Sequence, residues 1–220
     1  MNFLPQEFAI DSQEWAEILT SVIAISLSLS FVNGGMDVDS AQFVFLMAVF
    51  GITVGSGFVL HELAHKYVAI KFGSRARFRA WIFGLVLMLS LAIVPQLMGW
   101  GVFPLFLAPG AVMIYAQRRI SLKENGLISA AGPAVNIMLA GVFFALSTIF
   151  FSAVNVVTLG EYEIALPLIL VMGFRVNMFL AMFNLLPIFP LDGFKVVRWD
   201  WKIWLLMFLV SFLGSGLAGL

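Results

Sequence analysis

The stretch VLHELAHKYVAI, residues 59–70, places two histidines, a glutamate and a lysine at the end of a long apolar run. Ionisable side chains are costly where lipid surrounds a helix, and those found there usually face a protein interior or a water-filled cavity. If the run spans a membrane, this cluster indicates a functional site inside the protein. The composition of the whole chain decides whether the run does so.

The composition is that of a membrane protein. Hydrophobic residues make up 62% of the 220 residues and charged residues only 11%, and the mean hydropathy is +1.04. We therefore expect an integral, multi-pass protein embedded in a lipid bilayer. The formal net charge of zero gives no support to a nucleic-acid partner, and the lack of cysteine excludes disulfides.

Apolar segments long enough to span a bilayer recur along the chain, with short polar connections between them. One of them contains Pro104, Pro109 and several glycines, which predicts a broken or re-entrant piece. We predict an all-α polytopic membrane protein with about six transmembrane helices plus that broken or re-entrant segment. It is expected to form a single domain over residues 1–220, with no separate soluble domain. The predicted segments are 16–32, 43–65, 80–98, 99–116, 127–151, 163–186 and 201–219.

Charge predicts the direction of these segments. Basic residues collect after the second segment, before the fifth and before the last, whereas the connections 33–42 and 151–163 carry acidic residues and no basic one. Lys and Arg concentrate on the cytoplasmic side of short loops, so the basic connections are expected to be cytoplasmic. The first segment follows only acidic residues, which is the wrong flank for a cleavable signal peptide and gives no support to a cytoplasmic start.

His61, Glu62 and His65 fit the pattern H-E-x-x-H, and the chain has no other histidine. At about 100° per residue, the histidines lie roughly 40° apart around a helix, and Glu62 shares their face. Histidines at this spacing can each bind one zinc ion through a ring nitrogen, and the glutamate can reach a water on the metal. Two structural histidines at a helix end are the alternative, which the cost of ionisable groups in an apolar segment disfavours.

A catalytic zinc usually has three protein ligands and one open position, so a further ligand is needed. His61 is expected about 27 Å along its helix, near the cytoplasmic end of a hydrocarbon core about 30 Å thick. Asp192 is the carboxylate expected at that depth, in the stretch NLLPIFPLDG, residues 184–193, where two prolines interrupt the sixth segment. We predict that Asp192 is the third ligand of one zinc ion per chain. A simple loop exit from the membrane is the alternative interpretation of this stretch.

These motifs resemble those of the site-2 proteases, zinc metalloproteases that cut inside the membrane. The resemblance covers about residues 43–198 and implies zinc held by His61, His65 and Asp192, with Glu62 as general base. We expect no soluble regulatory domain of the kind that the family often carries, and an extra hydrophobic hairpin between the first two motifs. The matching residues are HELAH at 61–65, G-P-x-x-N at Gly132, Pro133 and Asn136, and N-x-x-P-x-x-x-x-D-G at Asn184, Pro187, Asp192 and Gly193.

The predicted function is hydrolysis of peptide bonds in transmembrane protein substrates, that is, regulated intramembrane proteolysis. Glu62 takes a proton from the zinc-activated water and returns it to the leaving amine. Asn184 is predicted to hydrogen-bond the substrate backbone or the oxyanion, and Asn136 is a second candidate that can instead tie its helix to a neighbour. The irregular segment near residues 104–110 is a candidate for holding an extended substrate by strand addition.

Other classes fit the residues less well. Ser56 lies about 140° from His61 around the same helix, and no further histidine can serve a serine protease as base. Asp192 has no second aspartate to form an aspartyl protease pair. A non-catalytic protein that binds or transports metal is the remaining alternative, but it would favour several sites along a path. Arg175, midway along the sixth segment, is expected to face protein or water. We favour a structural role, with the guanidinium bonded to carbonyls of a neighbouring helix, over a place on the water route to zinc or a contact for a substrate carbonyl.

Overall fold

Helices form most of the computed structural model, which describes residues 8–100, 109–116, 118–151, 156–159 and 162–217. The longest of them coincide with the apolar runs of the sequence, since a helix satisfies every backbone polar group within its own segment. In chain order the elements are α1 Ser12–Gly34, α2 Ser40–Phe50, the π-helical η1 Gly51–Gly55, α3 Ser56–Lys71, β1 Arg75–Ala80, α4 Ile82–Leu97, β2 Gly110–Tyr115, α5 Leu122–Phe150, β3 Val156–Leu159, β4 Tyr162–Ala165, α6 Leu166–Asn184, α7 Asp192–Trp199 and α8 Trp201–Leu217.

Four helices in the described ranges are long and apolar enough to cross a membrane, and two shorter apolar helices accompany them. Because α2, η1 and α3 follow one another without a break, they make one of the long helices. This arrangement confirms a multi-pass membrane protein that is mostly helical. The long helices are Ser12–Gly34, Ser40–Lys71, Leu122–Phe150 and Leu166–Asn184, and the shorter ones are Ile82–Leu97 and Trp201–Gly216.

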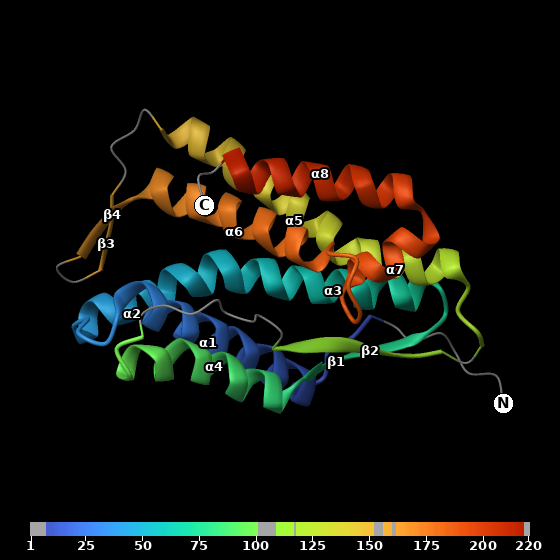
Figure 1. The fold of residues 1–220 in the computed structure, drawn as a ribbon, viewed down its shortest axis with the longest axis horizontal. Coiled ribbons are helices and arrows are strands. Elements are labelled where there is room, and N and C mark those ends of the chain that lie inside the picture. The colour runs from blue at the N-terminus through green and yellow to red at the C-terminus, as the bar shows by residue number, and fades with distance from the viewer. Residues whose placement is uncertain (1–7, 101–108, 117, 152–155, 160–161, 218–220) are drawn as a thin grey trace.

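Helix α3 lies in the middle of the molecule, between two groups of elements (Figure 1). On one side are α1, α4 and the pair of strands β1 and β2. On the other side α5 packs along α3, and α6, α7 and α8 cover α5. The motif at residues 61–65 is therefore enclosed from both sides, as its buried side chains show.

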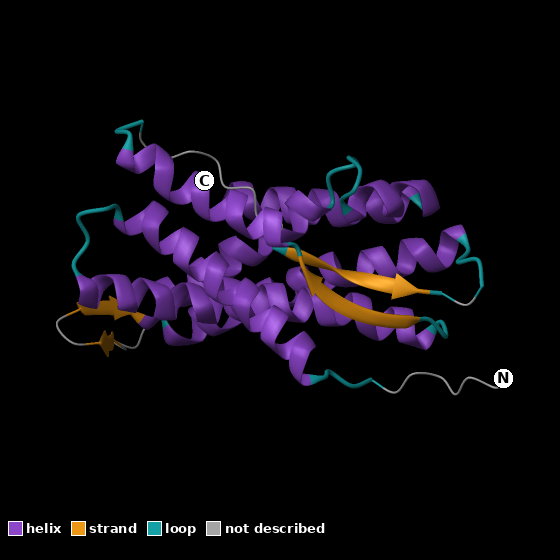
Figure 2. Ribbon diagram, turned by 90° about the horizontal axis from the view of Figure 1, so that it is seen from below, coloured by secondary structure: helices purple, strands orange, loops and turns teal. Residues whose placement is uncertain are grey.

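Two small antiparallel sheets interrupt the helical architecture (Figure 2), so the all-α prediction is wrong in this detail. Strand β1 pairs with β2 from Arg75 opposite Tyr115 to Ala80 opposite Gly110, and β3 pairs with β4. The predicted broken or re-entrant segment 99–116 therefore ends as a strand in its described part. Residues 101–108, which hold Pro104 and most of the predicted site for strand addition, lie outside the described residues.

The acidic start of the chain lies at the basic end of the molecule, where α1 begins beside β1 and the end of α3 (Figure 1). Three ion pairs join acidic residues at the start of the chain to basic residues of α3 and β1. The hydrogen bond to Glu17 also raises the pKa of Arg79 above its ordinary value. The pairs are Arg77 with Asp11 at 2.8 Å, Arg79 with Glu17 at 2.7 Å and Lys66 with Glu14 at 2.5 Å.

Candidate metal centre

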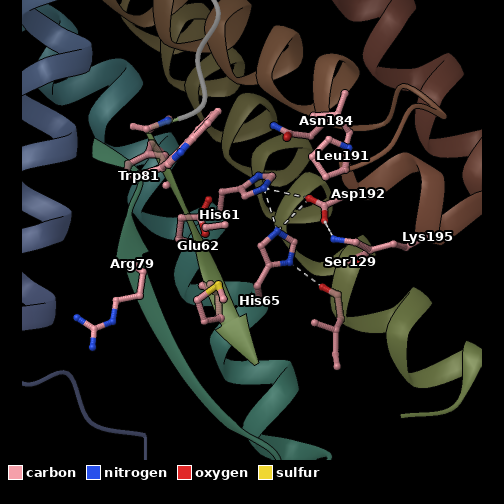
Figure 3. Close-up of a pocket in the computed structure, with 18 of the residues that line it drawn as sticks. His61, Glu62, His65, Arg79, Trp81, Ser129, Asn184, Leu191, Asp192 and Lys195 are labelled. Atoms are coloured by element: carbon pink, nitrogen blue, oxygen red, sulfur yellow. Dashed lines mark hydrogen bonds and ion pairs between the residues drawn. The ribbon is translucent and has the colours of Figure 1, made fainter. Parts of the chain in front are cut away.

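The structure brings His61, His65 and Asp192 together, as the sequence predicts (Figure 3). The two Nε2 atoms are 3.0 Å apart, and Asp192 Oδ2 lies 3.4 Å from His61 Nε2 and 3.0 Å from His65 Nε2. Helical spacing on α3 aligns the histidines, and Asp192 is the first residue of α7. A Cβ atom at Gly193 would collide with the backbone carbonyl of Leu185, so glycine lets α7 start this close to the end of α6.

Hydrogen bonds that both imidazoles donate to acceptors on α5 fix their tautomer. His61 Nδ1 lies 2.5 Å from Asn136 Oδ1, and His65 Nδ1 lies 2.7 Å from the carbonyl oxygen of Ile128. Both partners are acceptors, so each Nδ1 carries the hydrogen and donates it. Each Nε2 is left with its lone pair directed toward Asp192.

With both imidazoles neutral, the three converging atoms are therefore all electron-pair donors. Such a set is repulsive unless a cation lies among its members, and two imidazoles with a carboxylate are the ligand types that zinc takes in catalytic sites. The wall of this space is Gly132 of α5, where an added Cβ would lie 2.5 Å from the Nε2 atoms of both histidines. The residues present thus fit a zinc ion.

Glu62 is buried next to this cluster but contributes no atom to it. Within the described part of the chain, its Oε2 has no hydrogen-bond partner. The backbone N–H of Val112, on β2, is directed at the same carboxylate. A buried carboxylate with one oxygen unused can accept a proton from a neighbouring molecule.

Two buried asparagines connect the metal site to α6. Asn136 Nδ2 donates to the carbonyl of Gly57 at 3.1 Å and to Asn177 Oδ1 at 2.9 Å, while Asn177 Nδ2 donates to the carbonyl of Gly173 at 2.8 Å. Because the amide of Asn136 is directed at two acceptors, its oxygen faces His61. Asn136 belongs to a predicted motif, whereas no role was predicted for Asn177. A polar residue inside an apolar segment was the available signal for Asn177.

A cavity of about 690 Å³ opens beside the metal ligands. Asn184 lines it and is half-buried, and its Nδ2 donates to the Leu180 carbonyl of its own helix at 2.9 Å. One amide hydrogen and the oxygen of Asn184 therefore stay available to a bound molecule. Lys195, on α7, also lines the cavity, and its Nζ lies 3.6 Å from Asp192 Oδ1. Figure 3 shows Asn184, Lys195 and the three ligand residues around one space.

Arg175 does not reach this cavity. It is exposed on α6, and at about 100° per residue it lies roughly opposite the cavity-lining Asn184 around the helix axis. Within the described ranges no hydrogen bond or ion pair of Arg175 is present. Among the residues that the structure describes, neither the predicted bond to neighbouring carbonyls nor the place on the water route is found.

Comparison with known proteins identifies the family. The model for peptidase family M50 matches residues 48–167, which include H-E-x-x-H and G-P-x-x-N. A protein of Methanocaldococcus jannaschii named "Putative zinc metalloprotease" is 40% identical over 197 residues, which cover 90% of each chain. The chain belongs to peptidase family M50. A Bacillus subtilis protein that is also named as a "Putative zinc metalloprotease" is 33% identical over 159 residues, which cover 70% of this chain and 69% of the relative. No solved structure gives a significant match.

Membership of family M50 confirms the predicted resemblance to site-2 proteases. The protein is an intramembrane zinc metalloprotease, and zinc is its metal by family and by the cluster of two histidines and an aspartate. Asp192 lies beyond the residues that the M50 model matches. Its place in the cluster comes from the geometry of α7 alone.

Proposed function

We propose that His61, His65 and Asp192 hold the single zinc ion of this M50 protease and that Glu62 is its general base. The convergence of three lone-pair donors beside a carboxylate with a free oxygen carries this proposal. Zinc, when bound, supplies Lewis-acid activation of the attacking water and of the scissile carbonyl. Glu62 Oε2 takes a proton from that water and gives it to the leaving nitrogen.

The polar residues around the ligands have separate tasks in this proposal. Asn136 orients the His61 ring, because it accepts the Nδ1 hydrogen and so keeps Nε2 directed at the metal. Asn184 offers its spare amide hydrogen to the carbonyl oxygen of the substrate as negative charge develops there. Loss of Asn136 should therefore affect metal binding, whereas loss of Asn184 should affect turnover.

The substrate is a transmembrane protein whose cut region binds as an extended strand along β2. The outward-facing peptide groups of this strand lie on the side of Glu62, since the N–H of Val112 is directed at that carboxylate. A transmembrane helix hides its peptide bonds in its own hydrogen bonds, so it must unwind before it is cut. Pairing with a strand edge replaces the hydrogen bonds that unwinding removes.

All six apolar helices cross the bilayer in this proposal, and the chain has returned to the face of β1 where β2 begins, with the metal site near that cytoplasmic face. The described basic residues of the connections lie at the end of the molecule that holds β1, β2 and α7. Lys and Arg favour the cytoplasmic side of short loops. The connection with β3 and β4, at the opposite end, is then outside.

Replacing Glu62 with Gln tests the mechanism. The amide keeps the shape of the side chain but cannot accept the proton, so peptide cleavage should fall by a factor on the order of 100 to 10,000 while zinc remains bound. Zinc content of the purified protein and cleavage of a model membrane substrate are measured together. Asp192→Ala should instead lose zinc together with activity.

Glu163→Gln, which removes the same charge from the exposed strand β4, is the matched control and should leave both measurements unchanged. Full turnover in Glu62→Gln would disprove its role as the base. Full zinc stoichiometry in Asp192→Ala would remove Asp192 from the ligand set.

A further inference from the structure

Glu14 and Lys66 are buried charged residues that the proposed mechanism does not use. Lys66 Nζ donates to Glu14 Oε2 at 2.5 Å and to the carbonyl of Ala9 at 2.6 Å. Lys66 directly follows the metal ligand His65 on α3. A buried ion pair is weak evidence for stability, because desolvation offsets the attraction, so its position in the molecule needs another explanation.

The second oxygen of Glu14 binds the backbone of the sheet. Glu14 Oε1 accepts the N–H of Phe78 on β1 at 2.8 Å. One helical turn further along α1, Glu17 accepts the N–H of Ala80 at 3.0 Å and the guanidinium of Arg79 at 2.7 Å. Two carboxylates of α1 therefore occupy alternate N–H groups along the outer edge of β1.

Among the described strands, none pairs with the outer edge of β2, so β2 is the edge of the two-stranded sheet that lies away from α1. Phe78 lies opposite Val112. Along an antiparallel pair of strands, residue pairs that bond to each other alternate with pairs in which both residues direct their N–H and C=O groups outward. Since the N–H of Phe78 points outward to α1, the N–H of Val112 points outward on the other side, where Glu62 lies. Glu14 thus links Lys66 of α3, the residue after His65, to strand β1. Strand β1 in turn holds β2, whose outer edge faces the metal site.

We propose that Glu14 is a positioning residue that sets the register between β2 and the metal-site helix α3, and so determines which peptide bond is cut. The inference rests on the proposed pairing of the substrate with β2. A shift of β1 along α1 moves β2 with it, because the two strands are paired over their whole length. The peptide bond presented to Glu62 then changes, although the ligands of α3 and α7 stay where they are.

Glu14→Asp tests the inference with the charge retained. The side chain is one methylene shorter and cannot reach both Lys66 and the Phe78 N–H without moving β1. A misplacement of about 1 Å can cost on the order of 100-fold in rate, so cleavage at the original bond should fall about tenfold or more. Mass spectrometry of the products should show new ends at neighbouring bonds, and zinc content should stay at the wild-type value.

Glu14→Gln is the second variant, because its amide can still accept from Phe78 but no longer pairs with Lys66. Glu163→Asp, on exposed β4, is the matched control and should cut at the wild-type bond. A purely structural role predicts lower thermal stability with one unchanged cleavage position in both Glu14 variants, and that result overturns the inference.

A scan of the wild-type protein with N-methylated substrates separates the two proposals. If N-methylation does not inhibit cleavage at alternate positions, the substrate does not pair with β2, and the register inference fails together with that pairing. If inhibition alternates but the Glu14 variants cut at the wild-type bond, only the register inference fails.

Discussion

In the proposed zinc site both histidines keep Nε2 for the metal, because an acceptor from α5 occupies the other nitrogen. For His65 the acceptor is a backbone carbonyl, which no substitution removes. For His61 it is Asn136 Oδ1, and Asn136→Ala leaves the ring without its partner. Loss of such an orienting partner typically lowers metal affinity by about 10- to 100-fold, so we expect that loss here. Competition with a chelating dye measures it.

Two further variants make this prediction about Asn136 specific. Asn136→Asp restores an acceptor for His61, so its zinc affinity should lie closer to wild type than that of Asn136→Ala. Asn33→Ala removes an exposed amide that donates to Leu29 on α1 and should change nothing at the metal. A folded Asn136→Ala protein with wild-type zinc affinity would contradict the orienting role.

Local spacing allowed the sequence to predict the residues that the structure brings together on α3. His61 and His65 need only one helix to meet, and the broken end of the sixth segment gave the depth of Asp192. The contact of His61 with Asn136 could not be predicted in the same way. It depends on how α5 packs on α3, and hydropathy contains no information on the rotation of one apolar helix against another.

At the scale of elements, α5 approaches α3 through Gly132. An added methyl group would lie 2.5 Å from both Nε2 atoms, so Gly132→Ala must move the helices apart or fill the metal position. We expect zinc to be lost and cleavage with it, although alanine favours a helix by about 1 kcal/mol over glycine. Gly141→Ala, on the same helix with open space around it, is the matched control and should keep its zinc. Equal zinc content in both variants would show that α5 does not limit the metal space.

Strand β2 yields a prediction that involves the substrate only. Single N-methyl groups along the extended part of a model substrate should inhibit cleavage at alternate positions, because every second N–H of an added strand faces its partner. The loss of one such hydrogen bond should slow cleavage by about 2- to 12-fold, since each contributes about 0.5 to 1.5 kcal/mol. Inhibition that is uniform along the substrate would exclude pairing with β2.

The same strands show why sequence periodicity failed for this part of the fold. Val112, Met113 and Ile114 are apolar on both faces of β2, so the alternation of a half-buried strand is hidden. Strand β1 carries three arginines and resembles a charged loop. Each strand forms because it pairs with the other, and α4 separates the two in the sequence. Such a long-range contact cannot be predicted from local periodicity.

At the scale of the whole molecule, the charge distribution predicts a membrane orientation that can be measured. The chain has no cysteine, so each introduced thiol is unique. In sealed cells, Lys123→Cys at the start of α5 should resist a membrane-impermeant thiol reagent, whereas Asp37→Cys before α2 should react. Both positions are exposed. The reverse pattern would place the metal site near the outer face.

The acidic start of the chain, which gave no support to the orientation, is explained by the ion pairs of α1. Asp11, Glu14 and Glu17 neutralise basic residues of α3 and β1 at the same end of the molecule. A count of basic residues in loops cannot detect this, because the partners meet only after the helices have packed.

The proposed metal ligands lie far apart in the sequence, so the order of synthesis determines when the set of three is complete. Helix α3 with His61, Glu62 and His65 enters the membrane well before α7 has been synthesised. Until α7 packs on α5, the two imidazoles lack the carboxylate that completes their set. With Asp192 as the proposed third ligand, we therefore expect the nascent chain to be inert in the insertion machinery and to cut neither itself nor its neighbours before its own synthesis is almost complete.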